Sequence, residues 1–183
     1  IDFDWQNRIV LYDEKEEKSS AILTCFADVE TIRAGSIKLD GIPLAEFYKK
    51  NPIIKTFGYI FDTGIMLSNL SILENFLLPY QLRWGKSKQK LFYTQLQAWL
   101  DIFQISVDSS LRPAFIKPSI LKLLCYIRAL LLKPSFLLLD NPYYLLNQNQ
   151  RKLVFQILQK QKIPMLIASI DDDFTQSFAD KVI

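Results

Sequence analysis

The fold is decided by the stretch Phe136-Leu137-Leu138-Leu139-Asp140-Asn141-Pro142, at residues 136–142. Because its first residues are all apolar, the stretch predicts a strand that is buried on both faces and ends at Asp140. Further strands are predicted at 9–11, 36–39, 57–61 and 165–169. Helices are predicted at 19–29, 119–132, 148–160 and 173–178, the first with Ser19 or Ser20 as its N-cap. Strands that alternate with helices are typical of an α/β fold with a mostly parallel sheet.

A mostly helical block interrupts this alternation at about residues 69–112. Within it, four apolar side chains recur at helical spacing and predict one buried face: Phe92, Leu96, Trp99 and Phe103. We therefore predict a single domain over residues 1–183. Its core covers about 1–68 and 113–183, and its inserted helical subdomain covers about 69–112.

Composition excludes several classes of protein. The 183 residues are 50% hydrophobic, which is enough for one sizeable core, and the net charge of +3 argues against nucleic-acid binding. No run of about 18 apolar residues is present, so we expect a soluble chain without a membrane span or signal peptide. Cys25 and Cys125 lie in apolar runs and are expected to be reduced core thiols. Histidine is absent, which excludes imidazole chemistry.

Six ordered pieces of the chain resemble motifs of one family. They lie at residues 34–41, 58–62, 70–75, 128–134, 137–142 and 168–183. Together they resemble the ATPase subunit, or nucleotide-binding domain, of ABC transporters, which implies a core like that of P-loop NTPases. Within that family, residues 61–67 (Phe-Asp-Thr-Gly-Ile-Met-Leu) are most similar to the ATPases of Mla/Mce-type lipid transporters.

The phosphate-binding loop implied by this resemblance is degenerate. Its Lys-Ser pair is best placed at Lys18-Ser19, with one inserted residue before Gly35, and its glycine positions then fall on Tyr12, Lys15 and Glu17. Residues with side chains cost about 1–2 kcal/mol each at positive φ. One nearby carboxylate, such as those of residues 14, 16 and 17, would cost on the order of 4 kcal/mol against a phosphate. We expect a solvated acidic loop that binds neither ATP nor Mg²⁺.

The other positions that the resemblance implies are also altered. Asp62 stands in place of the Q-loop glutamine, Asn141 in place of the catalytic glutamate, and Ile170 in place of the H-loop histidine. Asn147 replaces the D-loop aspartate, and the signature motif falls on residues 116–120, where Pro118 lacks an N–H donor. Asp140 keeps the Walker B aspartate. We therefore expect no catalytic residue, no metal site and no cofactor, and a domain that is not an enzyme.

The segment from Gly58 to Trp84 keeps more of the family pattern. In this family a groove beside the Q-loop receives the membrane permease, and the residues predicted to line it are Met66, Leu67, Leu70, Ile72, Phe76, Tyr80 and Trp84. An equal alternative is that most of them are core. A basic cluster follows, which is a solvated loop or a contact for lipid headgroups: Arg83, Lys86, Lys88 and Lys90.

The leading hypothesis is therefore an inactive pseudo-ATPase that binds a membrane permease in a lipid transport complex, on the cytoplasmic face of the cell membrane. It would have no nucleic-acid partner, and a homodimer or a heterodimer is compatible with it. Two alternatives remain open. One is a weak or unconventional NTPase that uses Lys18, Ser19 and Asp140; the other is a free-standing regulatory or scaffold protein that has the same fold.

Overall fold

The computed structural model describes the chain except for residues 1, 4–6, 14–16, 28–30, 33 and 53–55. It divides into two compact units, which are described separately. Unit 1 contains residues 1–59, 134–143 and 161–183, and unit 2 contains residues 60–133 and 144–160. No helix among the described residues is both long enough and apolar enough to cross a membrane.

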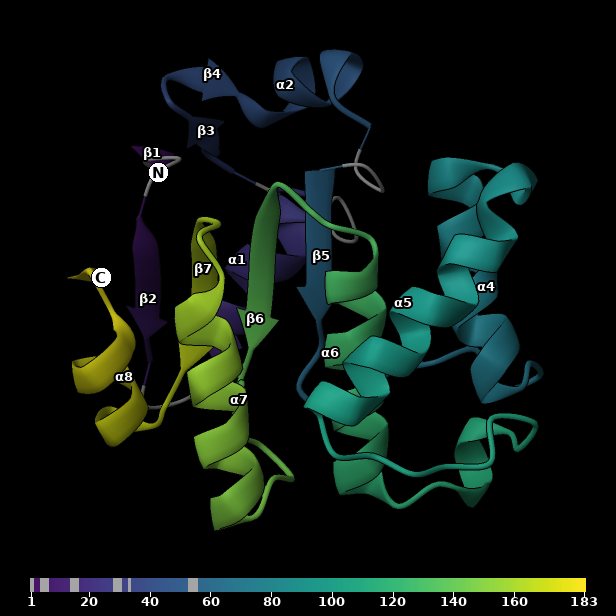
Figure 1. Cartoon of the computed structure of the whole chain (residues 1–183). Coiled ribbons are helices and arrows are strands. Elements are labelled where there is room, and N and C mark those ends of the chain that lie inside the picture. Colours follow the sequence, from purple (N-terminus) through teal and green to yellow (C-terminus); the bar gives the residue numbers. More distant parts are fainter. Residues whose placement is uncertain (1, 4–6, 14–16, 28–30, 33, 53–55) are drawn as a thin grey trace. The chain divides into compact units, whose positions relative to one another are not determined.

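Unit 1 is built on a five-stranded sheet with the order β5-β6-β7-β2-β8 (Figure 1). Its strands are β2 (Arg8–Tyr12), β5 (Phe57–Ile60), β6 (Phe136–Asp140), β7 (Met165–Ser169) and β8 (Lys181–Val182). The pairs β6/β7, β2/β7 and β2/β8 are parallel. Every residue of β6 and β7 is buried, as the apolar runs in these strands predict. The α/β fold with a mostly parallel sheet is therefore confirmed.

Three helices and a small second sheet complete the described part of unit 1. Helix α1 (Glu17–Phe26) contacts β6 and β7, and α8 (Asp172–Phe178) contacts β2 and β7. The small sheet consists of β1 (Asp2–Phe3), β3 (Lys38–Leu39) and β4 (Ile42–Pro43), and α2 (Leu44–Lys50) follows it. Asp40 and Gly41 turn the chain between β3 and β4, both at positive φ, as a tight hairpin requires.

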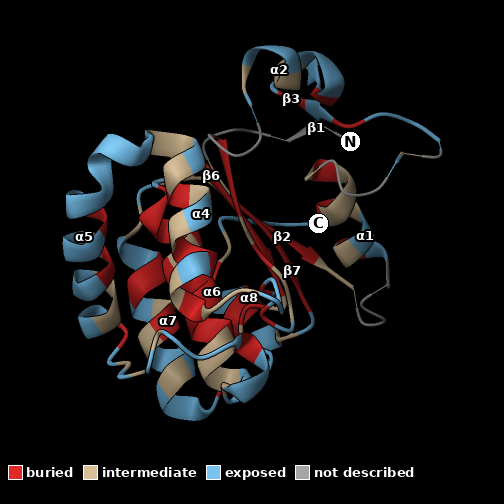
Figure 2. Cartoon of the chain, turned by 90° about the vertical axis from the view of Figure 1, so that its right-hand side faces the viewer, coloured by how far each residue is buried: buried red, intermediate tan, exposed pale blue. Residues whose placement is uncertain are grey.

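Unit 2 is helical. It contains α4 (Ile72–Trp84), the 3₁₀ turn η1 (Lys86–Lys88), α5 (Gln89–Ile102), the 3₁₀ turn η2 (Pro113–Phe115), α6 (Pro118–Leu131) and α7 (Gln148–Lys160). Ser71 and Glu74 form a capping box at the start of α4. The core joins successive helices through aromatic contacts. Tyr80 meets Phe92 at 5.0 Å between ring centroids, and Phe103 stacks on Tyr126 at 6.3 Å. Figure 2 shows α6 as mostly buried and α5 as exposed along one side.

Several predicted boundaries need correction. Ser19 and Ser20 lie inside α1, which starts at Glu17, so neither is its N-cap; Val29, the predicted end, lies outside the described residues. The strand predicted over 36–39 is confined to Lys38–Leu39. The division of the chain also differs from the prediction, because unit 2 includes α6 and α7 in addition to residues 69–112. The packing of α5 against α6 explains why α6 belongs to unit 2, and sequence periodicity does not report such packing.

Candidate functional site

The carboxyl end of β6 and the first turn of α1 meet in unit 1, where the resemblance predicts a nucleotide site. The Ser20 hydroxyl donates a 2.7 Å hydrogen bond to Oδ1 of Asp140, whose side chain is buried. Sequence reasoning chose the neighbouring Ser19 as the hydroxyl of this site. Ser19 is itself buried, and the serine bonded to Asp140 is the next one along the helix. The adjacent pair Ser19-Ser20 indicated in the sequence that a serine hydroxyl lies at this site. Because a helix places consecutive residues about 100° apart, only one of the two serines can face the end of β6.

The N-terminus of α1 is capped by an acidic side chain of the same chain. The backbone N–H of Lys18 donates a 2.9 Å hydrogen bond to Oδ2 of Asp13. N–H groups in the first turn of a helix have no partner within the helix, and in phosphate-binding loops they are the groups that receive the phosphate. A carboxylate of the protein therefore takes a donor that an anionic ligand would use. The Lys18 side chain is exposed, and residues 14–16 lie outside the described part.

The residues that follow β6 and β7 at the predicted catalytic positions, Asn141 and Ile170, have no acid–base group. Asn141 has a positive φ of 40°, and its N–H donates to the carbonyl of Ala168 at 2.9 Å, so its backbone continues the pairing of β6 with β7. Ile170 follows β7, and its side chain is 44% exposed. Next to it, Asp171 caps α8 by accepting the N–H of Phe174 at 2.8 Å. The nearest carboxylate after β7 therefore has a structural role.

The acidic and cysteine side chains of the described residues do not gather into a metal site. No group of three or more of them lies within reach of one ion in the parts of the chain that the structure describes.

One ion pair lies elsewhere in unit 1, where Arg8 binds Asp180 through Nη2 to Oδ1 at 2.8 Å and Nε to Oδ2 at 3.1 Å. The hydrogen bonds from Arg8 lower the pKa of Asp180 below its usual value. This pair ties β2 to the chain just before β8.

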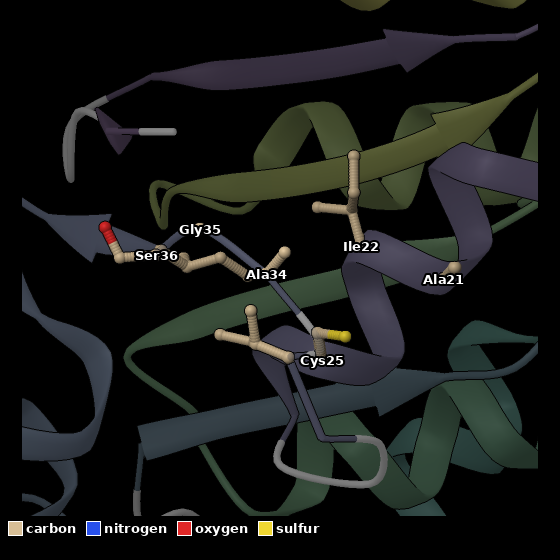
Figure 3. Close-up of a pocket in the computed structure, with 8 residues that line it drawn as sticks. Ala21, Ile22, Cys25, Ala34, Gly35 and Ser36 are labelled. Carbon is tan, nitrogen blue, oxygen red and sulfur yellow. The ribbon is translucent and has the colours of Figure 1, made fainter.

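A pocket of about 340 Å³ lies along α1 in the same unit (Figure 3). Its walls are small and apolar apart from the Cys25 thiol and the Ser36 hydroxyl, and they consist of Ala21, Ile22, Cys25, Ile32, Ala34, Gly35, Ser36 and Ile37. None of the described residues that line it is charged, so these residues offer no counter-ion to a phosphate. Its chemistry suits a small apolar group.

In unit 2, the segment at residues 61–65 is fixed on α6. Nζ of Lys122 is completely buried and donates to the carbonyl of Phe61 at 2.6 Å, and Nη2 of Arg128 donates to the carbonyl of Ile65 at 2.8 Å. Gly64 has a φ of +72°, and a Cβ on it would stand 2.8 Å from Cα of Lys122.

Asp62, the predicted Q-loop remnant, accepts the N–H of Thr63 at 2.6 Å. The sequence analysis did not identify Lys122, because no sequence pattern around a single lysine in an apolar helix indicates that its side chain is buried.

The residues predicted to line a partner groove separate into two groups. Ile72, Phe76 and Tyr80 are buried in the helical core of unit 2 and cannot line an open groove, so the prediction is wrong for these three. Met66, in the loop before α4, is also buried, so the prediction is wrong for this residue as well. The physical reason is that the inner face of α4 packs on α5 and α6. Leu70 and Trp84 are half-buried, whereas Leu67 is 52% exposed and, with Ile65 at 51%, forms the accessible part of this region.

Two further predicted positions lie at helix starts in unit 2. Pro118 is the first residue of α6, where its missing N–H leaves one donor fewer at the helix end. Asn147 precedes α7, and its Oδ1 accepts the N–H of Gln150 at 3.0 Å while Oε1 of Gln150 accepts the N–H of Asn147 at 3.0 Å. Asn147, at the predicted D-loop position, thus caps its own helix.

The order of the strands and the arrangement of the helices match a known fold. The fold is that of the nucleotide-binding subunits of ABC transporters. An ATP-binding cassette, solved as a dimer in a post-hydrolysis state with ADP and phosphate, matches 97% of this chain and 80% of its own length with a TM-score of 0.80 at 17% identity. An ATP-binding subunit of an ABC transporter matches 97% of this chain and 73% of its own with a TM-score of 0.77 at 20% identity.

Sequence relatives support the same resemblance. The methionine import ATP-binding protein MetN of Vibrio vulnificus is 26% identical over 169 residues, which cover 89% of this chain and 48% of that protein. The glutamate/glutamine/aspartate/asparagine transport ATP-binding protein BztD of Rhodobacter capsulatus is 25% identical over 96% of this chain and 68% of its own length. The chain thus spans about half the length of MetN. No family model matches it.

Proposed function

We propose that this chain is a catalytically inactive subunit of the ABC-transporter ATPase type, retained to bind a membrane permease or another partner. The observation that carries the proposal is the 2.9 Å hydrogen bond from the Lys18 N–H to the Asp13 carboxylate. In an active phosphate-binding loop this helix end faces the nucleotide. Here the donor already has an anionic partner, and a phosphate would have to displace it against like-charge repulsion.

The bond between Ser20 and Asp140 supports a register of the loop one residue later than the sequence suggested. If Ser20 takes the place of the magnesium-binding hydroxyl, the inserted residue before Gly35 is no longer needed. The loop lysine is then replaced by Ser19, and the flanking glycines by Asp13 and Lys18. In this register the chain has lost the cation that would reach the terminal phosphates, as well as the glycines.

The chemistry of the remaining positions supports the same proposal. Asn141 cannot accept a proton from an attacking water, and the exposed aliphatic Ile170 cannot contact a phosphate through a hydrogen bond. Asp140 could contribute one oxygen to a Mg²⁺ ion. A single carboxylate near a hydroxyl does not replace the oxygens that the nucleotide phosphates would supply. We therefore assign this chain no catalytic residue and no cofactor.

The partner side of the proposal rests on the exposed apolar residues around the 61–67 segment. Ile65 and Leu67 are each about half exposed, and the loop that carries them is held on α6 by Lys122 and Arg128. A rigid loop with an apolar tip suits the short cytoplasmic helix of a permease. The chain would then lie at the inner face of the cell membrane, alone or as one half of a dimer. The relatives named above are a methionine import protein and a glutamate/glutamine/aspartate/asparagine transport protein, so the lipid cargo suggested by residues 61–67 stays a prediction.

One alternative remains within the enzyme class. A weak NTPase that uses Lys18, Ser19 or Ser20, and Asp140 would need the Asp13 carboxylate to leave the helix end. The two proposals differ in nucleotide affinity, which calorimetric titration with ATP and Mg²⁺ up to millimolar concentration measures directly. We expect no heat and no thermal stabilisation. Binding tighter than roughly 100 μM, which corresponds to over about 5 kcal/mol, would refute inactivity.

A second experiment separates a permease partner from a free-standing scaffold. The tagged chain is purified from detergent-solubilised membranes, and co-purifying polytopic proteins are identified by mass spectrometry. We expect Leu67→Asn to remove a permease partner and Ile42→Asn, at a similarly exposed position of unit 1, to keep it. Equal recovery with both variants would place the contact elsewhere, and recovery of no permease would favour the scaffold.

A further inference from the structure

The turn between α4 and α5 has an unusual charge pattern. Residues 75–100 contain four cations and no carboxylate. All four lie at the end of α4, in η1 or at the start of α5, and Lys86, Lys88 and Lys90 are exposed. Arg83 also donates from Nη2 to the carbonyl of Lys133 at 3.1 Å, which brings a fifth cationic residue to the same end of unit 2. We call these residues the basic turn: Arg83, Lys86, Lys88, Lys90 and Lys133.

An aromatic ring lies within the basic turn. Trp84 has Cζ of Arg83 at 4.8 Å and Nζ of Lys88 at 5.0 Å from its ring centroid. Among the residues that the structure describes, no member of the basic turn forms a salt bridge with a carboxylate. Lys86, Lys88 and Lys90 are exposed to solvent, whereas Arg83 is partly buried and donates to the carbonyl of Lys133.

Helix stability explains only part of this arrangement. Cations near the C-terminus of α4 interact favourably with its dipole, which accounts for Arg83 and Lys86. Lys88 and Lys90 stand at the N-terminus of α5, where a cation is unfavourable, and the first turn of α5 has no acidic residue to offset them. These lysines therefore weaken the helix that carries them, which favours a role in contact with an anionic surface.

Exposed apolar side chains accompany the charges. Leu78 and Leu82 are one helical turn apart on α4 and are 43% and 65% exposed, and Leu91 on α5 is 48% exposed. α4 and α5 contact each other, and their exposed sides are visible in Figure 2. An acidic peptide would match the cations but would leave the leucines in water. A bilayer with anionic headgroups matches both, since acyl chains accept leucine and the interface accepts tryptophan.

We propose that the basic turn, with Leu82, Leu91 and Trp84, docks unit 2 directly on the surface of an anionic lipid bilayer. The lysines supply headgroup contacts, and the leucines enter the boundary between the headgroups and the acyl chains. This contact is independent of any permease. It would orient the subunit on the membrane before or beside a protein partner.

The test is co-sedimentation of the whole chain with vesicles of phosphatidylcholine alone or with 30% phosphatidylglycerol, a composition of about one anionic lipid in three. We expect binding to the anionic vesicles only, weakened by salt. The triple variant K86Q/K88Q/K90Q should bind about 100-fold more weakly, because each lysine near the surface contributes roughly fivefold. Leu82→Gln should also weaken binding while leaving the charge unchanged.

A matched control removes three exposed lysines elsewhere, as K49Q/K50Q/K160Q. The control should bind anionic vesicles within about threefold of the unmodified chain, since its lysines lie outside the basic turn. A loss as large as that of the first triple variant would overturn the proposal in favour of net charge alone. Absence of vesicle binding, or an unchanged affinity in Leu82→Gln, would overturn it too. No permease or nucleotide is present, so the result is separate from the proposed function.

Discussion

Replacing Gly64 by alanine should destabilise the chain through a single close contact. Gly64 has a φ of +72°, and a Cβ at this position would stand 2.8 Å from Cα and 2.9 Å from N of Lys122. Both atoms are backbone atoms of α6, so a side-chain rotation cannot relieve the clash. The 61–65 segment would have to move away from the helix, and the 2.6 Å bond from Lys122 to Phe61 would lengthen with it.

Two separate costs contribute to the expected loss. A side chain at positive φ costs about 1–2 kcal/mol. Overpacking a rigid contact costs about 1–3 kcal/mol. The sum is about 2–5 kcal/mol, which for a chain of this length lowers Tm by about 4–20 °C. Gly41 in the β3–β4 turn provides a control, because its φ is +77° and a Cβ there would meet nothing within 4 Å.

The assay is urea and thermal unfolding of both variants, followed by circular dichroism. Gly41→Ala should show only the backbone cost of about 1–2 kcal/mol, and Gly64→Ala should exceed it by about 1–3 kcal/mol. Equal destabilisation of the two variants would refute the reasoning, because it would mean that the 61–65 segment does not lie against the backbone of α6.

Three other changes have outcomes that the structure specifies. Asp180→Asn should destabilise the chain by about 0.2–1 kcal/mol at pH 6. The pKa of Asp180 is lowered in the folded state, chiefly by the hydrogen bond from Arg8, so its contribution is present above the usual value of 3.8 and disappears as the pH falls through the folded pKa. Urea titrations from pH 6 to 2 should therefore show the two proteins converging, and a constant difference would contradict the assignment. Ser71→Ala removes the capping box of α4 and should cost about 1 kcal/mol, measured as a fall in Tm of about 2–4 °C. Asn141→Glu restores a possible general base but should produce no phosphate release from ATP, since the helix end keeps its Asp13 cap; turnover by this variant would show that nucleotide binds.

Much of the fold could be predicted because the relevant signals are local. The apolar run of β6 and the periodicity of α7 (148–160) gave the bounds that the structure has. The predicted bounds of β7 (165–169) also hold. Helix ends were less predictable, because Ser19 and Ser20 resemble N-caps in sequence, whereas α1 starts two residues before Ser19. The grouping of α6 and α7 in unit 2 depends on contacts between distant segments and has no local signature.

The candidate site shows the same limit at the scale of single residues. Sequence reasoning identified the segment around Lys18 and Asp140, but not the partner of each side chain. Whether Ser19 or Ser20 reaches Asp140 depends on the rotation of α1 about its axis, which is set by its packing on β6 and β7. The predicted groove failed at Ile72 for a similar reason, since an apolar side chain suits an interior and an interface equally well.

The sequence by itself determined the class of fold, because strand and helix periodicity are properties of the chain alone, and it also shows the scarcity of glycine and the absence of histidine. Only the tertiary structure decided that Asp13 caps α1, that Ser20 binds Asp140 and that Lys122 is buried against the carbonyl of Phe61. The bonds to Asp140 and Phe61 join residues that are 120 and 61 positions apart, and the cap depends on where a loop closes. Such contacts follow from packing and from the need to satisfy buried polar groups, which no local pattern encodes.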